Sequence, residues 1–319
     1  MVEVAPRRQA RPVPLRVVVT CTQRKTRPVP GSLRLRTITA VRTSTRLDSW
    51  ARRLSSASVS TAPALGLYAG EHWDIARRLA TAANPTAPQT ELWVCSAGYG
   101  LIPTDAPVVP YSATFSPGGP DSVPAGTAGA ADWWAALASW EGPVRGPRSL
   151  ADLVASDPRA RVVLVLSAPY LRACRDDILA AVASLKDLKL LSIISAGTKD
   201  DKELQTFLLP ADARLQHVLG GTRQALNVRV AEHLLSAGIL DHDAMSGALA
   251  SLLASQPPVP RYDRLPATDD EVRAFIRAAV RSDGDITHTR LLREFRSAQR
   301  ACEQTRFAAL FRLERRAQL

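Results

Sequence analysis

The feature that most limits the possible folds is a series of short apolar runs that end in small or polar residues. Five such runs occur: "LRVVVTCTQRK", "ELWVCSAGYG", "RVVLVLSAPY", "LKLLSIISAGTK" and "RLQHVLGGTRQ". Their apolar residues do not alternate with polar ones, so we expect strands that are covered on both faces. Helical patterns such as "EHWDIARRLATAA" and "RDDILAAVASLKD" separate several of them. The sequence therefore predicts an α/β fold with a parallel sheet flanked by helices.

The carboxyl ends of these predicted strands mark the place where a ligand crevice would lie. Small residues let a ligand approach the backbone, and hydroxyl groups and helix N-termini supply donors for anions. Any single turn of this kind is also explained by the needs of a strand-to-helix connection, but its repetition favours a site. The ends read Cys21-Thr22-Gln23, Ser96-Ala97-Gly98, Ser167-Ala168-Pro169, Ser195-Ala196-Gly197-Thr198 and Gly220-Gly221-Thr222.

The motifs that bind common cofactors are absent from the sequence. It contains no GxxxxGK[ST] phosphate loop, and "SAGYG" lacks the third glycine of the dinucleotide-binding fingerprint. The five histidines are scattered and the four cysteines have no CxxC or CxxH spacing, so neither a zinc site nor an iron–sulfur cluster is indicated. We therefore expect no metal and no cofactor, and we expect the cysteines to be buried thiols.

Positive charge is concentrated at the two ends of the chain. The formal net charge is +11; residues 1–54 alone carry +11, and residues 289–319 carry a further +5. Clustered arginines and lysines release counterions from a phosphate backbone, so this distribution favours a polyanionic partner, which we expect to be DNA. A generally arginine-rich composition would explain the same charge without any partner.

A proline-rich stretch near the end of the chain suggests how it is divided. The apolar runs are strand-sized and no secretory signal is visible at the start, so we expect no membrane partner and a cytoplasmic location. We expect a basic flexible tail over residues 1–14, an α/β catalytic domain over 15–254, a linker over 255–268 and a basic helical module over 269–319.

The helical module contains three helical patterns, at residues 269–281, 289–298 and 303–315. Apolar residues recur in them at helical spacing, and arginines remain available for an outer face. This pattern suits a helix-turn-helix-like module in which Arg290, Arg293 and Arg300 contact DNA phosphates. A small helical cap docked on the main domain would give the same pattern.

The segment from Pro103 to Gly129 is rich in Pro, Gly and Ser and is too long for a neutral connection in a compact domain. We therefore expect a functional or mobile loop. The stretch "ADWWAALASWEG" after it predicts a helix that carries three tryptophans. Base stacking on them is one interpretation, and core packing is the more common fate of such residues.

Four stretches together resemble an uncharacterised bacterial family: "VVVTCTQRK", "LYAGEHWDIARRLA", "CSAGYGLIPTDAPVVPYSATF" and "LGGTRQALNVRVAEHLL". Members of that family carry an SCSKKK strand end and a loop of the type LSAKYGLL…D…PYD.T. The family is similar to the peroxide-stress protein family and to domains associated with tRNA-guanine transglycosylase. Related phage-defence proteins are DNA glycosylases that excise glucosylated hydroxymethylcytosine. The resemblance covers roughly residues 15–240 and implies a similar activity, on a fold compatible with a uracil-DNA-glycosylase-like architecture.

Within the loop, the sequence matches the family pattern at six positions and departs from it at two. Gly98 stands where a lysine is usual, and Ser112 stands where an aspartate is frequent, so the loop lacks one charge of each sign. The matching residues are Ser96, Tyr99, Gly100, Asp105, Tyr111 and Thr114.

Cleavage of an N-glycosidic bond develops positive charge on the sugar and negative charge on the departing base. We therefore expect Asp105 near the sugar, with Tyr99 and Tyr111 as walls or donors for a flipped base. Asp105 is also typical of a turn, and the tyrosines of a core. Glu71 is the reserve carboxylate, which a helix N-terminus would also explain. The substrate-binding candidates are Cys21, Gln23, Lys25, Gly100, Thr114, Ser167, Ser195, Thr198 and Arg223, with Ser96 and Gly98 as backbone donors.

The sequence thus favours a DNA glycosylase, a hydrolase that removes a modified base from phage DNA as an antiviral defence and leaves an abasic site. One alternative is a base-exchanging or nucleotide-processing enzyme that acts on tRNA or free nucleotides. The other is a non-enzymatic DNA-binding stress or regulatory protein. Formation of abasic sites separates the first function from both alternatives.

Overall fold

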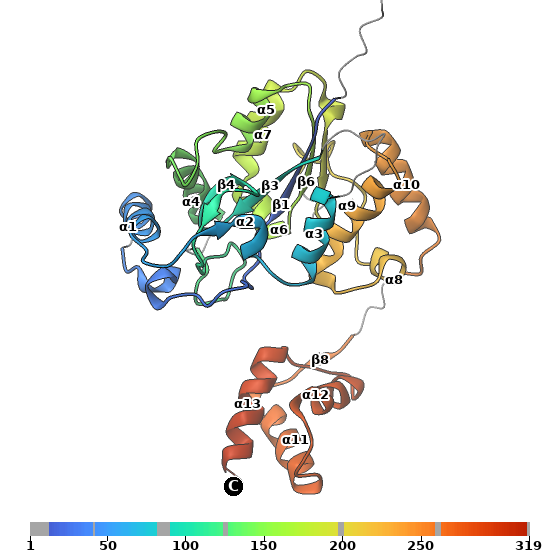
Figure 1. Cartoon of the computed structure of the whole chain (residues 1–319). Coiled ribbons are helices and arrows are strands. Elements are labelled where there is room, and N and C mark those ends of the chain that lie inside the picture. Colours follow the sequence, from blue (N-terminus) through green and yellow to red (C-terminus); the bar gives the residue numbers. More distant parts are fainter. Residues whose placement is uncertain are drawn as a thin grey trace, which may run out of the picture. The chain divides into compact units, whose positions relative to one another are not determined.

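The computed structural model describes residues 13–40, 42–81, 90–123, 127–196, 201–258 and 263–317. The chain divides into two compact units, Met1–Pro257 and Pro258–Leu319, and each has a buried core of its own. Figure 1 shows the helices and strands of both units. In the described part of the chain, no helix is both long enough and apolar enough to cross a membrane.

The first unit is built on a five-stranded sheet with the strand order β4-β3-β1-β6-β7. Four strands run parallel, and the edge strand β4 runs antiparallel to β3. The α/β class is therefore confirmed, with a mixed, mostly parallel sheet in place of the expected parallel one. The strands are β1 (Leu15–Thr20), β3 (Thr90–Ser96), β4 (Gly100–Pro103), β6 (Arg161–Val165) and β7 (Leu191–Ile194).

The antiparallel direction of β4 follows from the short connection that leads into it. Only residues 97–99 separate β3 from β4, whereas a parallel neighbour needs a crossover of roughly a dozen residues or more. The register pairs Ser96 with Gly100 and Trp93 with Pro103. The chain in β4 therefore runs back toward the start of β3.

The central strand β1 is covered on both faces, as its unbroken apolar run predicts. All six of its residues are buried, and Val17, Val18 and Val19 have no exposed surface. Strand β7 also buries every residue. Burial on both faces explains why these strands lack the alternation of polar and apolar residues that a half-exposed sheet shows.

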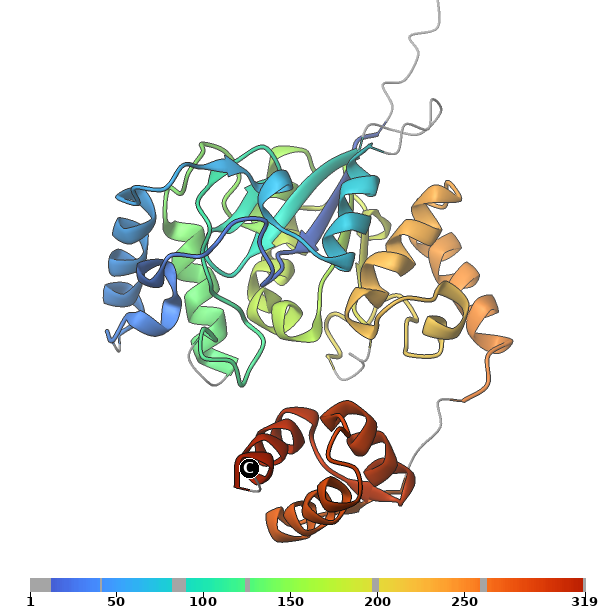
Figure 2. The same ribbon diagram turned by 60° about the horizontal axis from the view of Figure 1, so that its bottom comes forward.

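Two groups of helices cover the two faces of the sheet (Figures 1 and 2). On one face α3 packs against β3, and α9 packs against α3, β6 and β7. On the other face α4 to α7 pack among themselves, and α4 contacts β4. The helices are α3 (Glu71–Thr81), α4 (Thr127–Ser139), α5 (Leu150–Ser156), α6 (Ala168–Ala173), α7 (Arg175–Ser184) and α9 (Leu226–Ser236), together with α1 (Thr43–Ser55), α2 (Ala64–Leu67) and α10 (His242–Ala254).

The fifth predicted strand is wrong. The run "RLQHVLGGTRQ" forms the short helix α8 (Leu215–Leu219) and the turn after it. Leu215 and Leu219 are four residues apart and share one helical face, and the helix packs against α9. Gly220 and Gly221 then take the left-handed conformation, with φ of 67° and 70°, which ends the helix.

The segment expected to be a functional or mobile loop is largely packed into the first unit. It begins in β4 and continues into β5 (Pro107–Val108), which pairs antiparallel with β2 (Ala62–Pro63). Tyr111 and Phe115 are buried in the core. Residues 124–126 of the segment lie outside the described residues. Pro107, Pro117 and Pro120 of the segment are exposed, so its packing is carried mainly by its apolar residues.

The second unit consists of three helices around a small core. A capping box formed by Thr268 and Glu271 starts the first of them. A short strand pair, β8 (Leu265–Pro266) with β9 (Arg300–Ala301), is not predicted by the sequence patterns. The helices are α11 (Asp269–Ser282), α12 (His288–Ser297) and α13 (Gln304–Ala317), and their core includes Val272, Ile276, Leu291, Leu292, Phe295, Phe307, Leu310 and Phe311.

Candidate functional site

The carboxyl ends of β1 and β3 form a topological switch point of the sheet. The connection that leaves β1 first forms α1, which packs against α4, and then reaches α3 on one face, whereas the connection that leaves β3 leads through β4 to α4 on the other. Adjacent strands with connections to opposite faces open a crevice at their carboxyl ends, where ligands bind in α/β proteins. The candidate site is therefore built from the residues that follow β1 and β3 and from those that begin α3.

The turn after β3 is closed by its own hydrogen bonds. The hydroxyl oxygen of Ser96 accepts from the backbone N–H groups of Gly98 and Tyr99, at 3.2 and 3.0 Å. The indole N–H of Trp50 donates to the carbonyl oxygen of Gly98 at 2.8 Å. The backbone donor expected at Gly98 is thus already used inside the turn, and Ser96 has no exposed surface.

Tyr99 and Tyr111 lie inside the core and do not form the walls of an open pocket. Tyr111 has no exposed surface and Tyr99 has 3%. The Tyr111 hydroxyl lies 2.6 Å from Ser96 Oγ and 3.0 Å from the hydroxyl of Tyr68. Burial raises the pKa of all three tyrosines, so their hydroxyls stay protonated. They form a polar floor beneath the crevice, which we call the tyrosine floor (Tyr68, Tyr99 and Tyr111).

Gly98 is required by the way Tyr111 packs on this turn. A Cβ atom at position 98 would lie 2.4 Å from Cε2 of the Tyr111 ring, far inside the contact distance between carbon atoms. The lysine that stands here in the resembling family therefore has no room in this chain. An ammonium group reaches the same ring from the end of β1 instead, through Lys25.

Lys25 places its ammonium group over the tyrosine floor. Nζ lies 4.5 Å from the ring centroid of Tyr111 and 5.0 Å from that of Tyr68, a cation–π arrangement. It donates to the carbonyl oxygens of Thr22 at 2.5 Å and Gln23 at 3.4 Å. Among the described residues no carboxylate pairs with Lys25, and burial lowers its pKa to about 8. The side chain is partly exposed and so can be reached from the crevice.

Asp105 lies away from this edge of the sheet. It occupies the exposed turn between β4 and β5, and its carboxylate makes no hydrogen bond or ion pair with the described part of the chain. Since β4 runs back along β3, Asp105 is carried toward the amino end of β3, roughly 15 Å from Ser96 by strand geometry. The loop returns to Ser96 only at Tyr111. The fold therefore does not bring Asp105 to the residues with which the sequence grouped it.

Three further candidates, Gly100, Thr114 and Ser195, are buried, and a fourth, Thr198, lies outside the described residues. Gly100 has a φ of 73°, and a Cβ there would lie 3.2 Å from the carbonyl oxygen of Leu137, which explains the glycine by packing. Thr114 and Ser195 are 3% and 2% exposed. Gly100, Thr114 and Ser195 therefore serve the structure of the site.

The other candidates at the strand ends differ in exposure. Cys21 is buried, with its sulfur 3.3 Å from the hydroxyl of Tyr170. Ser167 precedes α6 and is partly exposed. Gln23 and Arg223 are exposed. Gln23 and Arg223 can therefore contact a ligand directly, whereas Cys21 only packs beneath it.

Glu71 begins α3 at the carboxyl edge of the sheet. Its Oε1 accepts from Nη2 and Nε of Arg229, at 2.6 and 3.0 Å. The backbone N–H of Thr222 lies 3.2 Å from both carboxylate oxygens. Hydrogen bonds from Arg229 and Thr222 lower the pKa of Glu71, so its carboxylate is ionised at neutral pH. Its side chain is 31% exposed and so remains open to a ligand.

The segment that was wrongly predicted to be the fifth strand contributes Gly221, which packs against this ion pair. A Cβ atom at Gly221 would lie 2.1 Å from Nε of Arg229 and 2.2 Å from Oε1 of Glu71, and its φ is 70°. Glycine is therefore needed both for the backbone conformation and for the close approach. The two adjacent glycines were the sequence signal for this part of the site, although they follow a helix and not a strand.

Glu71 and Lys25 are connected through the segment at Tyr68. Lys25 and Tyr68 form an antiparallel bridge, and Glu71 follows Tyr68 by three residues, so the Cα atoms of Lys25 and Glu71 lie within roughly 16 Å. The sequence missed Tyr68 as part of the site, because its hydroxyl meets Tyr111 only in the fold. A partly exposed carboxylate and a partly exposed amine thus lie on neighbouring segments at the carboxyl edge of the sheet.

His72, which the sequence reasoning also missed, is a neutral imidazole beside this crevice. Its Nε2 lies 3.2 Å from the carbonyl oxygen and 3.4 Å from the hydroxyl oxygen of Thr20. Burial lowers the pKa of His72 to about 4. It therefore contributes hydrogen bonds at the end of β1 but no charge at neutral pH.

The tryptophans of α4 are core residues. Trp133 and Trp134 are 1% and 2% exposed. The indole N–H of Trp133 donates to the carbonyl oxygen of Ala97, and that of Trp134 donates to Oδ2 of Asp177, each at 2.8 Å. Trp133 thus packs α4 against the turn after β3, and Trp134 packs it against α7; neither buried side chain offers a ring face for base stacking.

The three arginines expected to contact DNA differ in their partners. Arg290 pairs with Glu294 at 3.2 Å, and Arg300 pairs with Glu271. Arg293 is exposed and makes no ion pair with the part of the chain that the structure describes. Its guanidinium group is thus the most available of the three to a phosphate.

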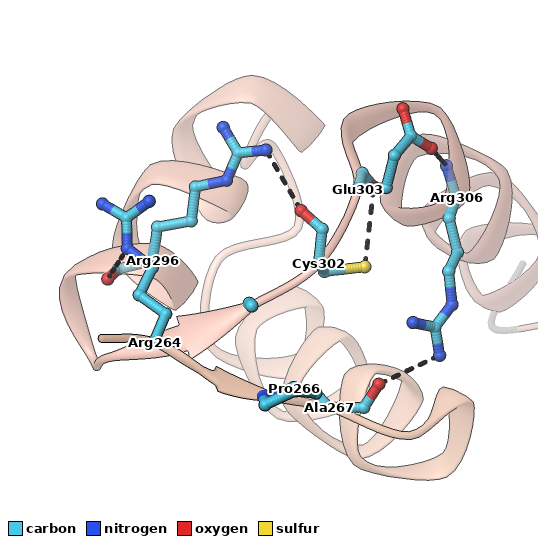
Figure 3. A pocket seen from close by; sticks show the side chains of 8 residues that line it. Arg264, Pro266, Ala267, Arg296, Cys302, Glu303 and Arg306 are labelled. Carbon is cyan, nitrogen blue, oxygen red and sulfur yellow. Dashed lines mark hydrogen bonds between the residues drawn. The ribbon is translucent and has the colours of Figure 1, made fainter. Parts of the chain in front are cut away.

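A cavity in the second unit gathers other arginines that the sequence reasoning did not single out (Figure 3). It has a volume of about 380 Å³, and Arg264, Arg296 and Arg306 line it together with Cys302 and Glu303. Arg296 donates to the carbonyl oxygen of Cys302 at 3.1 Å, which fixes its guanidinium group at the wall. The carboxylate of Glu303 accepts backbone N–H groups of the first turn of α13. Arg306 also pairs with Asp269, so the cavity wall carries arginines that are partly compensated, and its remaining positive charge suits an anionic ligand.

Comparisons with known proteins find no match: no family model, no curated protein and no solved structure is similar to this chain. In the described residues, no group of three or more His, Cys, Asp and Glu side chains is arranged to hold a metal ion. A function must therefore be argued from the chemistry of the crevice at β1 and β3 and of the basic second unit.

Proposed function

We propose that the protein is a DNA glycosylase that removes a modified base from phage DNA and leaves an abasic site. The observation that supports it most directly is that Glu71 and Lys25 lie on neighbouring segments at the carboxyl edge of the sheet, linked by the Lys25–Tyr68 bridge. Cleavage of an N-glycosidic bond needs negative charge near the sugar and positive charge or donors near the base. In this proposal the role of the carboxylate passes from Asp105 to Glu71.

Glu71 suits the sugar side of the reaction because its charge is fixed in advance. Arg229 holds Oε1 with two hydrogen bonds, and Thr222 donates to the carboxylate from its backbone N–H and from its side chain. An ionised carboxylate held in place stabilises an oxocarbenium-like sugar without reorganising during the reaction.

Lys25 suits the base side. With a pKa of about 8, most Lys25 side chains carry a proton at pH 7, and an ammonium group stabilises negative charge on a departing base. In the tyrosine floor beneath it, the hydroxyls of Tyr68 and Tyr111 are hydrogen-bonded to one another, and that of Tyr111 also to Ser96. The crevice thus offers a nucleobase one cationic group, Lys25, above the rigid and uncharged tyrosine floor.

The second unit supports DNA as the substrate. Its exposed Arg293 and its arginine-lined cavity both suit phosphate groups. Contacts of this kind give affinity without reading the base, so recognition of the modified base is left to the crevice of the first unit.

The direct test compares three DNA substrates. The full-length protein is incubated with phage DNA that contains glucosylated hydroxymethylcytosine, with DNA that contains hydroxymethylcytosine, and with unmodified DNA; alkali then cleaves any abasic sites. We expect breaks in modified DNA only. Glu71→Gln should lower single-turnover base release by on the order of 10²-fold or more, with DNA binding retained, because it removes a preorganised charge.

Glu232→Gln is the matched control. Glu232 pairs with Arg78 at 2.7 Å and joins the same two helices, α9 and α3, as the Glu71–Arg229 pair. Arg78 lies seven residues after Glu71, about 10 Å along the helix. Glu232→Gln should release base at the wild-type rate. Equal losses in both variants would mean that Glu71 acts on the packing of α3 and α9, and a loss in Asp105→Asn alone would return the catalytic role to Asp105.

A second candidate, DNA binding without chemistry, is favoured by the basic second unit taken by itself. It predicts salt-dependent binding of the folded protein to duplex DNA with no abasic sites in any of the three substrates. The two functions therefore give opposite results in one experiment.

A further inference from the structure

Lysine is rare in this chain, with five residues against 36 arginines. The other four lysines lie between residues 186 and 202, whereas Lys25 stands alone at the end of β1. Lysine and arginine carry the same charge, but only the lysine amine loses its proton readily and then acts as a nucleophile. A lysine at this position in an arginine-rich chain therefore suits chemistry that uses a free amine.

The surroundings of Lys25 differ from those of a surface lysine in the same unit. Lys189 is exposed and pairs with Asp243 at 2.6 Å, and this hydrogen bond raises its pKa. Lys25 has two carbonyl acceptors and two aromatic rings around Nζ, and burial lowers its pKa to about 8. About a tenth of Lys25 side chains are therefore neutral at pH 7, against a far smaller share of ordinary lysines.

We propose that Lys25 is a covalent nucleophile that forms an imine with the aldehyde of an abasic deoxyribose, and that the protein thereby cuts the DNA strand at that site. The inference rests on the proposed glycosylase function for the source of the aldehyde. It adds a second reaction, lyase cleavage, to the removal of the base.

The reaction balances without any further reagent. The lone pair of Nζ attacks the aldehyde carbon C1′ of the ring-opened sugar, and the carbonyl oxygen takes up a proton. The resulting carbinolamine loses this oxygen as water, which leaves the protonated imine. A proton then leaves C2′ to water, the C3′–O bond breaks, and the 3′-phosphate departs with the bonding electrons. Water finally hydrolyses the unsaturated imine and returns the amine of Lys25.

The geometry holds the amine ready for this attack. The carbonyl oxygens of Thr22 and Gln23 orient Nζ from the chain side, and the rings of Tyr68 and Tyr111 support it from below. The side chain of Lys25 is partly exposed at the carboxyl edge of the sheet, on a segment that pairs with Tyr68, three residues before Glu71. Since no described carboxylate pairs with the amine, no ion pair has to be broken before it reacts.

The test uses a labelled DNA duplex with one abasic site that is made beforehand, so it does not depend on base removal by this protein. The full-length protein is incubated with the duplex and borohydride, which reduces an imine to a stable secondary amine. We expect a covalent protein–DNA complex, with the adduct mapped by mass spectrometry to Lys25. Without borohydride we expect strand cleavage at the abasic site.

Three variants, each checked by thermal unfolding, make the test specific. Lys25→Arg keeps the positive charge but not the nucleophile, and Lys25→Met removes both; each should lower the covalent yield at least tenfold. Lys189→Met should leave the yield unchanged. No adduct with folded wild type, an adduct mapped to the N-terminal amine, or full yield with Lys25→Arg would overturn the inference. If modified DNA loses its base but no adduct forms, the glycosylase proposal stands and the imine does not.

Discussion

The packing of Gly98 against Tyr111 gives a prediction whose magnitude follows from the structure. In Gly98→Ala the new Cβ would lie 2.4, 2.6 and 3.0 Å from three atoms of the Tyr111 ring, where roughly 3.5–4.0 Å is the favourable distance. The Tyr111 ring has no space to move away from the new atom, because it packs edge-on against Trp50, Tyr68 and Tyr99, with ring centroids 5.3–6.4 Å apart. The ring or the turn must therefore shift by about 1 Å.

The expected loss of stability combines two effects. Overpacking of this kind typically costs about 1–3 kcal/mol, and a shift of Tyr111 that breaks its hydrogen bond to Ser96 costs about 1 kcal/mol more. For a unit of this size a total of about 2–4 kcal/mol lowers Tm by roughly 5–15 °C. Thermal unfolding followed by circular dichroism measures it. The change should be far smaller in a Tyr111→Ala background, since the two positions are in contact.

Gly247→Ala is the control for this experiment. Gly247 lies inside α10, and a Cβ there meets no atom within 4 Å, so alanine should be neutral or stabilise by about 0.5–1 kcal/mol. A Tm of Gly98→Ala within about 2 °C of the wild type, on the scale of such shifts, would refute the close packing of the turn on Tyr111. It would also reopen the turn as a flexible, ligand-binding loop.

Two shorter predictions concern charge. Burial alone would raise the pKa of Asp121, but hydrogen bonds from Arg36 and Ser112 outweigh it and lower the pKa to about 2. Asp121→Asn should therefore destabilise the first unit by up to about 2 kcal/mol at pH 7, and the Tm difference from the wild type should shrink as the pH falls from about 4 to 2; a difference as large at pH 2 as at pH 7 would contradict this. In the second unit, Arg293→Gln should reduce the logarithmic salt slope of duplex DNA binding by about 1, and Arg290→Gln should reduce it less because Glu294 already pairs with Arg290.

Much of the sheet can be predicted from the sequence because burial on both faces leaves a local signature. The unbroken run of β1 is one example, since every residue of the strand is buried. The same signature fails for Leu215–Leu219, because five apolar and polar residues in a row fit either a strand or one turn of helix. Strand β4 escapes detection for a different reason: it has four residues and begins with a glycine of positive φ, so its sequence resembles a turn.

The direction of that one short strand decides which carboxylate reaches the crevice. Treated as a single loop, the stretch from Ser96 to Thr114 places Asp105 beside Tyr111; with β4 antiparallel, Asp105 is carried to the other end of β3 while Tyr111 returns. Glu71 gains its place through Arg229, which lies 158 positions away in the chain. No local pattern encodes a contact of that separation. What the sequence does mark is a glycine pair that lets the backbone close over the ion pair, and, separately, a single lysine among arginines shortly after β1.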